Sequence, residues 1–563
     1  MLQIFLFSFL TSIQIIISGY LFYLLFISKQ ISYNNIFSFG LLGFILIGFL
    51  GLFFNFFVSL NRYLNDAFFI FPLIFFLIFY FNKKILKRAV FFSLIISFFL
   101  TLTVAFDNHY TPDAGSYHLP YISLLNENKI IIGGSNIHYR FGHISIFQYI
   151  SALYNNHLFE DNGISIPLGL IYCFFVGYLI MEILNHQNNK ILYIFLFIIL
   201  SFVLFRMNRY SDLGNDGPAN IFFFYLIIES LKKNIFIYKL KITSVLSVFI
   251  FLNKITLLLA FLVPIYLLIK NFKINSLINR TNIFSLIFLT LFLVKNFLLT
   301  GCLAFPIEQS CFQKVFWFND NNKYAAKYVR MENEAWTKGW PDQIELKKNH
   351  SDYISDLGWI KTWKKNHGIV IIKKLSPFLI FLTIVFVTFY LFNRKSFYFN
   401  NEEKDKDSPI SLMLITICFI GSLMWFFKFP VFRYGYSYFI SFFGLTVSFI
   451  LNFFLISFDL QKFKKNIIII FLVLISVVSL KNLIRIIPSY QNSLHAWPQI
   501  YSNDFKYTKN SYKPVYKNSK LFFFKNETKT CFYSKSPCTH LFNFDLDDLN
   551  LKEIYGYKIY YFN

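Results

Sequence analysis

The sequence predicts an all-α polytopic membrane protein with about 12–14 transmembrane helices. Three observations indicate this class: 56% of the 563 residues are hydrophobic, only 15% are charged, and the mean hydropathy is +0.52. Soluble domains carry about 25% charged residues, and this much apolar side chain exceeds what one soluble core can bury. Helices are the expected spanning elements, because lipid offers the backbone no hydrogen-bond partners. A soluble enzyme and a disordered chain are excluded.

Apolar runs divide the chain into alternating membrane and loop regions. The candidate spans are 3–27, 36–60, 67–82, 89–106, 163–184, 190–205, 219–231, 242–253, 255–269, 282–299, 369–392, 409–427, 434–457 and 466–484. The resulting regions are N-terminal transmembrane helices at 1–106, a first loop at 107–162, central transmembrane helices at 163–299, a second large loop at 300–368, C-terminal transmembrane helices at 369–486 and a tail at 487–563. The first span has no positively charged start and no small-residue cleavage site, so we expect it to be retained.

The distribution of basic residues predicts the orientation. The net charge is +24, but no compact basic domain is present, so we expect no nucleic-acid partner. Counted along alternating loops, seven loops on one side hold 20 Lys and Arg, and four short loops on the other side hold 6. The positive-inside rule makes the first set cytoplasmic. The chain is therefore expected in the cytoplasmic (inner) membrane as a multi-pass protein, with its three long segments and its active face in the periplasm or extracellular space.

The first long loop holds a candidate catalytic carboxylate. Asp113 follows Pro112 at the expected start of a helix over about 114–127. A second helix at 143–157 carries a polar stripe at helical spacing, so we expect both helices to lie at the membrane interface. Asp113 is either a simple helix cap or a general base for a hydroxyl at the membrane edge.

Basic and polar residues on the same predicted face are candidate phosphate ligands. Arg140 and His138 suit a phosphate, because a guanidinium donates a bidentate fork; the alternative is anchoring to lipid headgroups. Lys254 and Arg433 are charges at span ends, which either contact a lipid phosphate or extend to the interface. Asp212 and Asp216 flank a polar turn, which either caps the next helix or holds a divalent cation, Mg²⁺ or Mn²⁺, through hard oxygen ligands.

The cysteines and the tail add a structural prediction. Cys302 and Cys311 share the second large loop, and Cys531 and Cys538 share the tail, so two local disulfides are expected on the oxidising side. Cys173 and Cys418 lie inside spans as small apolar residues. The tail is expected to form a small external α/β cap, with its clearest strand at 555–562.

Several short motifs, taken in order, resemble a known superfamily. They are Asp113-Ala-Gly-Ser-Tyr117-His118-Leu-Pro120, Asn136-Ile-His138-Tyr-Arg140-Phe-Gly142, Ser211-Asp212-Leu-Gly-Asn-Asp216, Lys295-Asn296 followed by Gly301-Cys302 and Pro306, and Arg433-Tyr434. This series is similar to the GT-C superfamily of membrane glycosyltransferases, and most closely to a poorly characterised group of bacterial GT-C-like multi-spanning membrane proteins. The likeness covers about residues 90–440.

The resemblance implies a transferase with a polyprenyl-phosphate-linked sugar donor and a glycan, lipid or protein acceptor. It assigns the base to Asp113, with Asp107 as the alternative. Substrate and phosphate contacts fall to His118, Asn136, His138, Arg140, Lys254, Arg433 and Tyr434. Two other classes stay open: a transporter or flippase for lipid-linked saccharide, which predicts ionisable residues deep in the spans, and a non-catalytic protein of cell-surface polysaccharide assembly.

Overall fold

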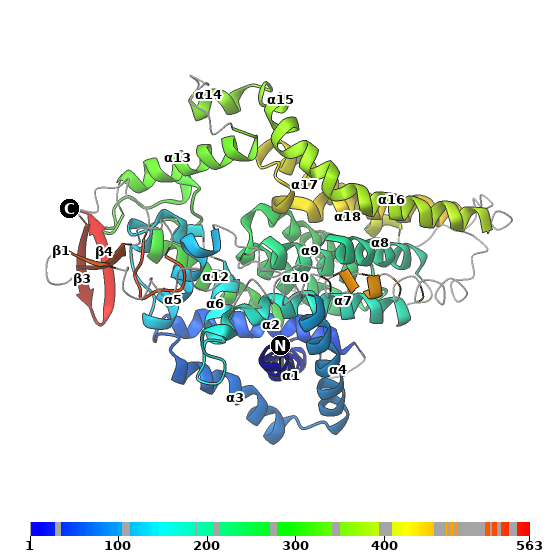
Figure 1. The fold of residues 1–563 in the computed structure, drawn as a ribbon, viewed down its shortest axis with the longest axis horizontal. Helices are drawn as coiled ribbons and strands as arrows, with labels where there is room; N and C mark the ends of the chain where they lie inside the picture. The colour runs from blue at the N-terminus through cyan, green and yellow to red at the C-terminus, as the bar shows by residue number, and fades with distance from the viewer. Residues whose placement is uncertain are drawn as a thin grey trace.

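The computed structural model is mainly helical, with small antiparallel hairpins near the C-terminus (Figure 1). It describes residues 2–28, 35–103, 113–143, 145–185, 189–206, 214, 216–270, 278–318, 320–340, 349–392, 408–454, eight positions between 469 and 484, 513–517, 521–525, 531–539 and 549–562. Two predicted site residues, Asp107 and Asp212, and most of the predicted span at 466–484 lie outside these residues.

The N-terminal helices form one side of the molecule (Figure 1). They are α1 Leu2–Phe22, which continues as the π-helical turn Tyr23–Ile27, α2 Ile36–Asn55, α3 Arg62–Phe79 and α4 Lys83–Thr103. Helix α1 packs against α2 and α4. The α1–α2 contact is made through glycines: a Cβ on Gly19 would lie 1.7 Å from the Phe39 carbonyl oxygen, and one on Gly43 would lie 2.1 Å from that of Ile15. The two backbones therefore touch directly.

The middle of the molecule is a layer of helices (Figure 1). It contains α7 Ile166–Asn185, α8 Lys190–Arg206, α9 Asp216–Leu231, α10 Phe236–Asn253, the 3₁₀ segment Ile255–Phe261, α11 Leu262–Lys270 and α12 Arg280–Thr300. Helices α16 Ile369–Phe392, α17 Ser408–Lys428 and α18 Phe432–Phe454 lie along its upper right edge in Figure 1. Helix α18 packs on α8 and α9.

Among the described residues, nine helices are long and apolar enough to cross a membrane. Thirteen of the 14 predicted spans overlap described apolar helices. Nine of these spans fall on the nine long helices, and three fall on α4, α8 and α9. The predicted span 255–269 falls on a shorter apolar helix. The sequence prediction of a helical chain is thus confirmed over this part of the protein.

The first loop folds into short helices against the bundle. The π-helical turn η2 Ala114–His118 leads into α5 Leu119–Glu127, and the 3₁₀ turns η3 Gly134–Asn136 and η4 Tyr139–His143 precede α6 Ile146–Leu153. Every residue of α6 is buried. The prediction of a surface amphipathic helix at 143–157 is therefore wrong for α6: polar residues of its stripe bond to protein groups, with Gln148 contacting His118 and Asn155 contacting Asn126.

The second loop and the tail complete the fold. The loop contains α13 Asp320–Thr337, α14 His350–Ser355 and α15 Trp359–Trp363, which runs through the π-helical turn Lys364–Gly368 into α16. In the described tail, β1 Lys513–Lys517 pairs with β2 Leu521–Lys525, and β3 Leu549–Ile554 pairs with β4 Tyr557–Phe562, both antiparallel. Strand β4 begins at residue 557, two residues later than the predicted strand at 555–562, because Tyr555 and Gly556 form the hairpin turn with positive φ.

Candidate functional site

A single large cavity of about 930 Å³ collects most of the predicted site residues. Its walls come from the η2 and η4 turns of the first loop, the ends of α8, α9 and α10, the loop after α12, and helices α13, α16, α17 and α18. The described lining residues include seven Lys and Arg and three Asp and Glu. The basic residues are Arg140, Arg206, Lys254, Arg330, Lys374, Lys428 and Arg433, and the acidic residues are Asp113, Asp216 and Glu334. The cavity is therefore suited to an anionic ligand.

A chain of four charged side chains crosses this cavity. Arg433 Nη2 lies 3.0 Å from Asp113 Oδ2, and Arg433 Nε lies 3.5 Å from Asp216 Oδ2. Asp216 also pairs with Lys254, whose ammonium lies 3.9 Å from the centre of the Tyr434 ring. Asp113 and Arg433 keep 37% and 42% of their side-chain surface exposed, so a ligand in the cavity can reach both.

The local folding of each segment places these charges. Asp113 makes no capping hydrogen bond to the turn that follows it, so the helix-cap prediction is wrong and its carboxylate is available to Arg433. Asp216 begins α9, where an acid is favoured by the helix dipole. Lys254 has an extended backbone between α10 and the 3₁₀ segment, which directs the chain out of the helix at the cavity.

A residue that the sequence did not single out holds two of the charges together. Asn220, fully buried in α9, donates to the backbone carbonyls of Asp216 at 2.7 Å and Arg433 at 3.3 Å. Its side-chain oxygen accepts the backbone N–H of Ser437 at 3.1 Å. One amide therefore ties the start of α9 to the start of α18.

The Asn-x-His-x-Arg motif is split between structural and cavity roles. Asn136 donates to the backbone carbonyls of Trp317 and Tyr560, at 3.0 and 2.8 Å, and does not line the cavity. His138 is buried outside the cavity lining, and its Nδ1 accepts the backbone N–H of Arg140 at 3.1 Å. Of the three, only Arg140 reaches the cavity, where its guanidinium lies 5.6 Å from the Tyr117 ring. Asn136 and His138 thus shape the turn that presents Arg140.

His118 lines the cavity as a neutral hydrogen-bond donor. Gln148 Oε1 accepts both the backbone N–H and the hydroxyl of Ser145, at 3.0 and 2.6 Å. Its Nε2 therefore faces His118 Nδ1 at 2.6 Å and donates to it, which places the imidazole proton on Nε2. Burial lowers the pKa of His118 to about 4 and that of the neighbouring cavity residue His143 to about 3.

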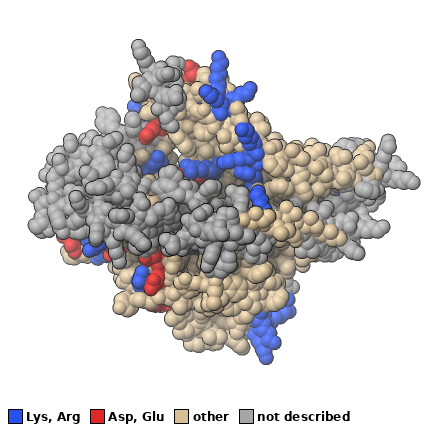
Figure 2. Space-filling model, in the orientation of Figure 1, with Lys and Arg blue, Asp and Glu red and all other residues tan. Residues whose placement is uncertain are grey.

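Two further basic residues line the cavity beside Phe432. The Arg206 guanidinium and the Lys374 ammonium lie 5.9 and 5.5 Å from the Phe432 ring centre, and Arg206 and Arg433 both repel the Lys374 charge. Within the described part of the chain, no carboxylate pairs with Arg206 or Lys374, whereas Lys428 pairs with Glu334 and Arg330 with Glu308. Figure 2 shows basic side chains gathered in a band across the upper middle of this face.

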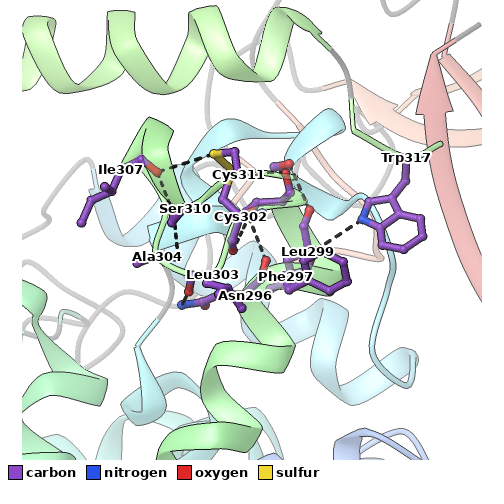
Figure 3. Close-up of a disulfide and its surroundings, with 12 residues drawn as sticks. Asn296, Phe297, Leu299, Cys302, Leu303, Ala304, Ile307, Ser310, Cys311 and Trp317 are labelled. Atoms are coloured by element: carbon purple, nitrogen blue, oxygen red, sulfur yellow. Dashed lines mark hydrogen bonds between the residues drawn. A yellow bond between two sulfur atoms is a disulfide. The ribbon is translucent and has the colours of Figure 1, made fainter. Parts of the chain in front are cut away.

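The loop after α12 forms another wall of the cavity and contains a disulfide (Figure 3). Helix α12 ends at Gly301, whose φ of 76° favours glycine, and the Thr300 hydroxyl accepts the N–H of Cys302. Cys302 is joined to Cys311, and Asn296 donates to the Leu303 carbonyl at 3.2 Å. The second predicted cysteine pair, Cys531 and Cys538, is also joined. Ala304, Phe305 and Pro306 line the cavity.

The predicted divalent-cation site at Asp212 and Asp216 is described only in part, because Asp212 lies outside the described residues. Among them, no group of three or more His, Cys, Asp or Glu side chains converges. The Asp216 carboxylate already has Lys254 and Arg433 beside it, and their positive charges oppose a second cation. We therefore assign no step to a metal ion.

The sequence missed Arg206, Lys374, Tyr117 and His143 as cavity residues. Arg206 directly follows the predicted span 190–205, as Arg433 directly precedes the predicted span 434–457, so the criterion that selected Arg433 could have found it. Lys374 lies five residues inside α16 and gives no such signal. Tyr117 lies within the first of the two first-loop motifs, and His143 directly follows the second. Both line the cavity because these segments form the η2 and η4 turns.

Comparison with known proteins gives a family without an assigned activity. No curated protein and no solved structure matches the chain. The profile of the family described as "Domain of unknown function (DUF8201)" matches residues 1–440, and the chain therefore belongs to this family.

Proposed function

We propose that the chain is an integral membrane glycosyltransferase of GT-C type. It transfers a sugar from a polyprenyl-phosphate-linked donor to a glycan, lipid or protein acceptor at the outer face of the cytoplasmic membrane. One observation carries the proposal: an accessible carboxylate, Asp113, shares a cavity with an excess of bases, four of which lie on α8, α16, α17 and α18. A carboxylate and phosphate-binding cations in one chamber are what transfer from a sugar phosphate requires.

The exposed faces of several helices support the membrane part of the proposal. Side chains on α3, α4 and α16 that point away from the protein are large and apolar, including Phe71 at 61%, Phe98 at 60% and Ile372 at 67% exposure. Exposed apolar area on this scale favours contact with lipid. The predicted orientation puts position 116 outside and position 84 inside. An impermeant thiol reagent should therefore label Ser116→Cys but not Lys84→Cys in intact cells.

The proposed reaction is an inverting single displacement. The acceptor hydroxyl oxygen attacks the anomeric carbon of the sugar, and the bond from that carbon to the donor phosphate oxygen breaks with its electron pair on the phosphate. Asp113 takes the hydroxyl proton. His118 donates a hydrogen bond from Nε2 to a sugar or phosphate oxygen. The sugar inverts because attack and departure occur on opposite faces.

Arg433 connects the base to the leaving group. At rest it pairs with Asp113, which holds the carboxylate in place. A donor phosphate competes for the guanidinium, so donor binding frees Asp113 for the acceptor. This coupling limits activation of the carboxylate to the donor-bound state.

Arg206 and Lys374 are the basic residues best placed to bind the donor phosphate. Lys254 and Arg433 are already compensated by Asp216 and Asp113, whereas Arg206 and Lys374 have no acid partner within the described residues. Both lie beside Phe432, next to α16, whose outer face is apolar. A lipid chain leaving the phosphate along α16 would bury apolar surface on both partners.

The test combines a deletion strain with two matched variants. The deletion should remove a surface glycan and accumulate its polyprenyl-linked donor. Wild-type chain should restore the glycan, and Asp113→Asn should not, although it reaches the membrane at wild-type level. Asp352→Asn, which removes an exposed carboxylate on α14 outside the cavity, should restore it fully. Full activity of Asp113→Asn would refute the assigned role.

A buried ionic cluster is the observation most favourable to a transporter. Lys232 lies 2.6 Å from Glu229 and 3.1 Å from Glu182, and all three side chains are at most 1% exposed. None of them lines the cavity, and they lie near the ends of α7 and α9 rather than at their centres. Their position favours a structural lock between these helices, so transfer remains the better-supported activity.

A further inference from the structure

The π-helical turn η2, which directly follows Asp113, leaves one backbone carbonyl without a hydrogen-bond donor inside the helix. In the π-helical turn η2, the Leu119 N–H bonds to the Ala114 carbonyl, five residues back. The next carbonyl in this series, that of Gly115, would need the N–H of residue 120. Residue 120 is proline, which has no N–H. The Gly115 carbonyl must therefore find a donor elsewhere, because a buried carbonyl without one is costly.

The tail supplies that donor twice. The N–H groups of Cys531 and Phe532 both donate to the Gly115 oxygen, at 3.1 and 2.8 Å. Phe532 has a φ of 50°, a left-handed conformation that costs a non-glycine residue roughly 1 kcal/mol. This conformation lets two successive N–H groups point at one oxygen, as in an anion-binding nest. Such a geometry persists only where its surroundings hold it.

Further contacts bind the same tail loop along α5. The Tyr533 hydroxyl donates to Asn126 Oδ1 at 3.0 Å, and the Ser536 N–H and hydroxyl donate to Glu127 Oε2, each at 3.1 Å. The loop is closed by the buried Cys531–Cys538 disulfide. Closing a loop covalently reduces its freedom when undocked, so less entropy is lost when it docks.

We propose that the disulfide-closed loop 531–538 is a positioning element for Asp113. It completes the η2 turn from outside, fixes the direction in which the chain leaves residue 113, and thereby holds the carboxylate at Arg433. Its effect on transfer rests on the proposed function, whereas its effect on the turn does not. The loop lies outside residues 1–440, which match the family profile.

Hydrogen exchange measured on the full chain in lipid nanodiscs tests the structural part. In the variant C531S/C538S, amides of peptides covering 113–127 should exchange at least tenfold faster than in the wild type. The matched control, C302S/C311S, opens the other disulfide and should change exchange near 296–318 while leaving 113–127 unaltered. Equal exchange at 113–127 in C531S/C538S and wild type would overturn the proposal.

A second variant separates positioning from general stabilisation. Pro120→Ala gives the turn its own N–H for Gly115, so removing the tail disulfide in this background should accelerate exchange at 113–127 less than threefold. An equally large effect with and without Pro120 would contradict the role of the Gly115 carbonyl. If C531S/C538S fails to reach the membrane, reducing the single remaining disulfide of C302S/C311S with dithiothreitol provides the same comparison.

The two proposals fail in different ways. Faster exchange at 113–127 together with loss of the surface glycan supports both. Faster exchange with the glycan retained keeps the positioning element and counts against Asp113 as the base. Unchanged exchange refutes the positioning element, whatever happens to the glycan.

Discussion

Asp113 Oδ2 lies 3.0 Å from Arg433 Nη2, although 320 residues separate them along the chain. Arg433 also contacts Asp216 at 3.5 Å, so the two acids share one guanidinium. They differ in their other partners, because Asp216 alone holds Lys254. Removing each acid should therefore have a different consequence.

Asp113→Asn should lower the transfer rate at least a hundredfold, the usual contribution of a general base, and leave thermal stability unchanged, because Arg433 keeps Asp216. Asp216→Asn should lower stability by about 1–3 kcal/mol, because it leaves Lys254 without a carboxylate in a buried position. Thermal unfolding in detergent and a transfer assay separate the two. Equal loss of stability in both variants would contradict the division of roles.

Arg206→Gln and Lys374→Gln should each weaken binding of inorganic pyrophosphate at least tenfold, because each removes a charge-assisted contact worth about 1.5–3 kcal/mol. The matched control is Lys84→Gln, which removes the same charge at the start of α4, outside the cavity lining. Isothermal titration at two salt concentrations measures the change. Unaltered affinity in both cavity variants would exclude this part of the cavity as the phosphate position.

Lys232→Met should destabilise the protein by about 3–5 kcal/mol, because it leaves the carboxylates of Glu182 and Glu229 buried without their cation. Its neighbour Lys233 is exposed, so Lys233→Met changes the same charge at almost the same place. The control should unfold within about 0.5 kcal/mol of the wild type. Similar midpoints for the two variants would show that the cluster is not a structural lock.

Stability should fall as the pH is lowered from about 6.5 to about 4. His118 is neutral in the folded chain because burial lowers its pKa to about 4, whereas the unfolded chain takes up the proton below its ordinary pKa of 6.5. The unfolded state therefore binds more protons over this window. The free energy of unfolding falls by about 3 kcal/mol when the whole window has been crossed. His118→Gln should flatten this part of the profile of unfolding midpoint against pH. An unchanged slope in the variant would contradict a buried neutral imidazole.

The long apolar helices could be predicted from the sequence, because hydropathy over 18 or more residues is a local property. Lys254 and Arg433 could be chosen as site residues because charges at the ends of apolar runs are costly without a role. Asp113 and Arg140 could be chosen because a carboxylate suits a general base and a guanidinium suits a phosphate. Their meeting in one cavity depends on tertiary packing, which no local pattern contains. Helix α6 shows the limit most clearly. Its polar stripe predicted a helix at the membrane interface, but the helix is buried and the stripe contacts other polar groups of the protein.

Asn136 and His138 show a second limit of prediction from sequence. Both occupy a motif with Arg140, and residue type alone cannot separate a ligand from a residue that supports a ligand. The structure separates them because the Asn136 amide contacts two backbone carbonyls and His138 Nδ1 accepts the backbone N–H of Arg140. Lys374 was missed for a related reason, since its position inside an apolar helix resembles an ordinary snorkelling lysine.

The glycine contact between α1 and α2 bears on how substrates reach the chamber. At Gly19 and Gly43 the backbone of each helix lies against the backbone of the other, so no side chain separates the two helices at these positions. We expect α1 and α2 to move together as one rigid unit, on the side of the molecule that carries the N-terminus. Under the proposed function, we expect the widening that admits a lipid-linked sugar to come from the opposite side, where α13 lines the cavity and α16 is largely exposed.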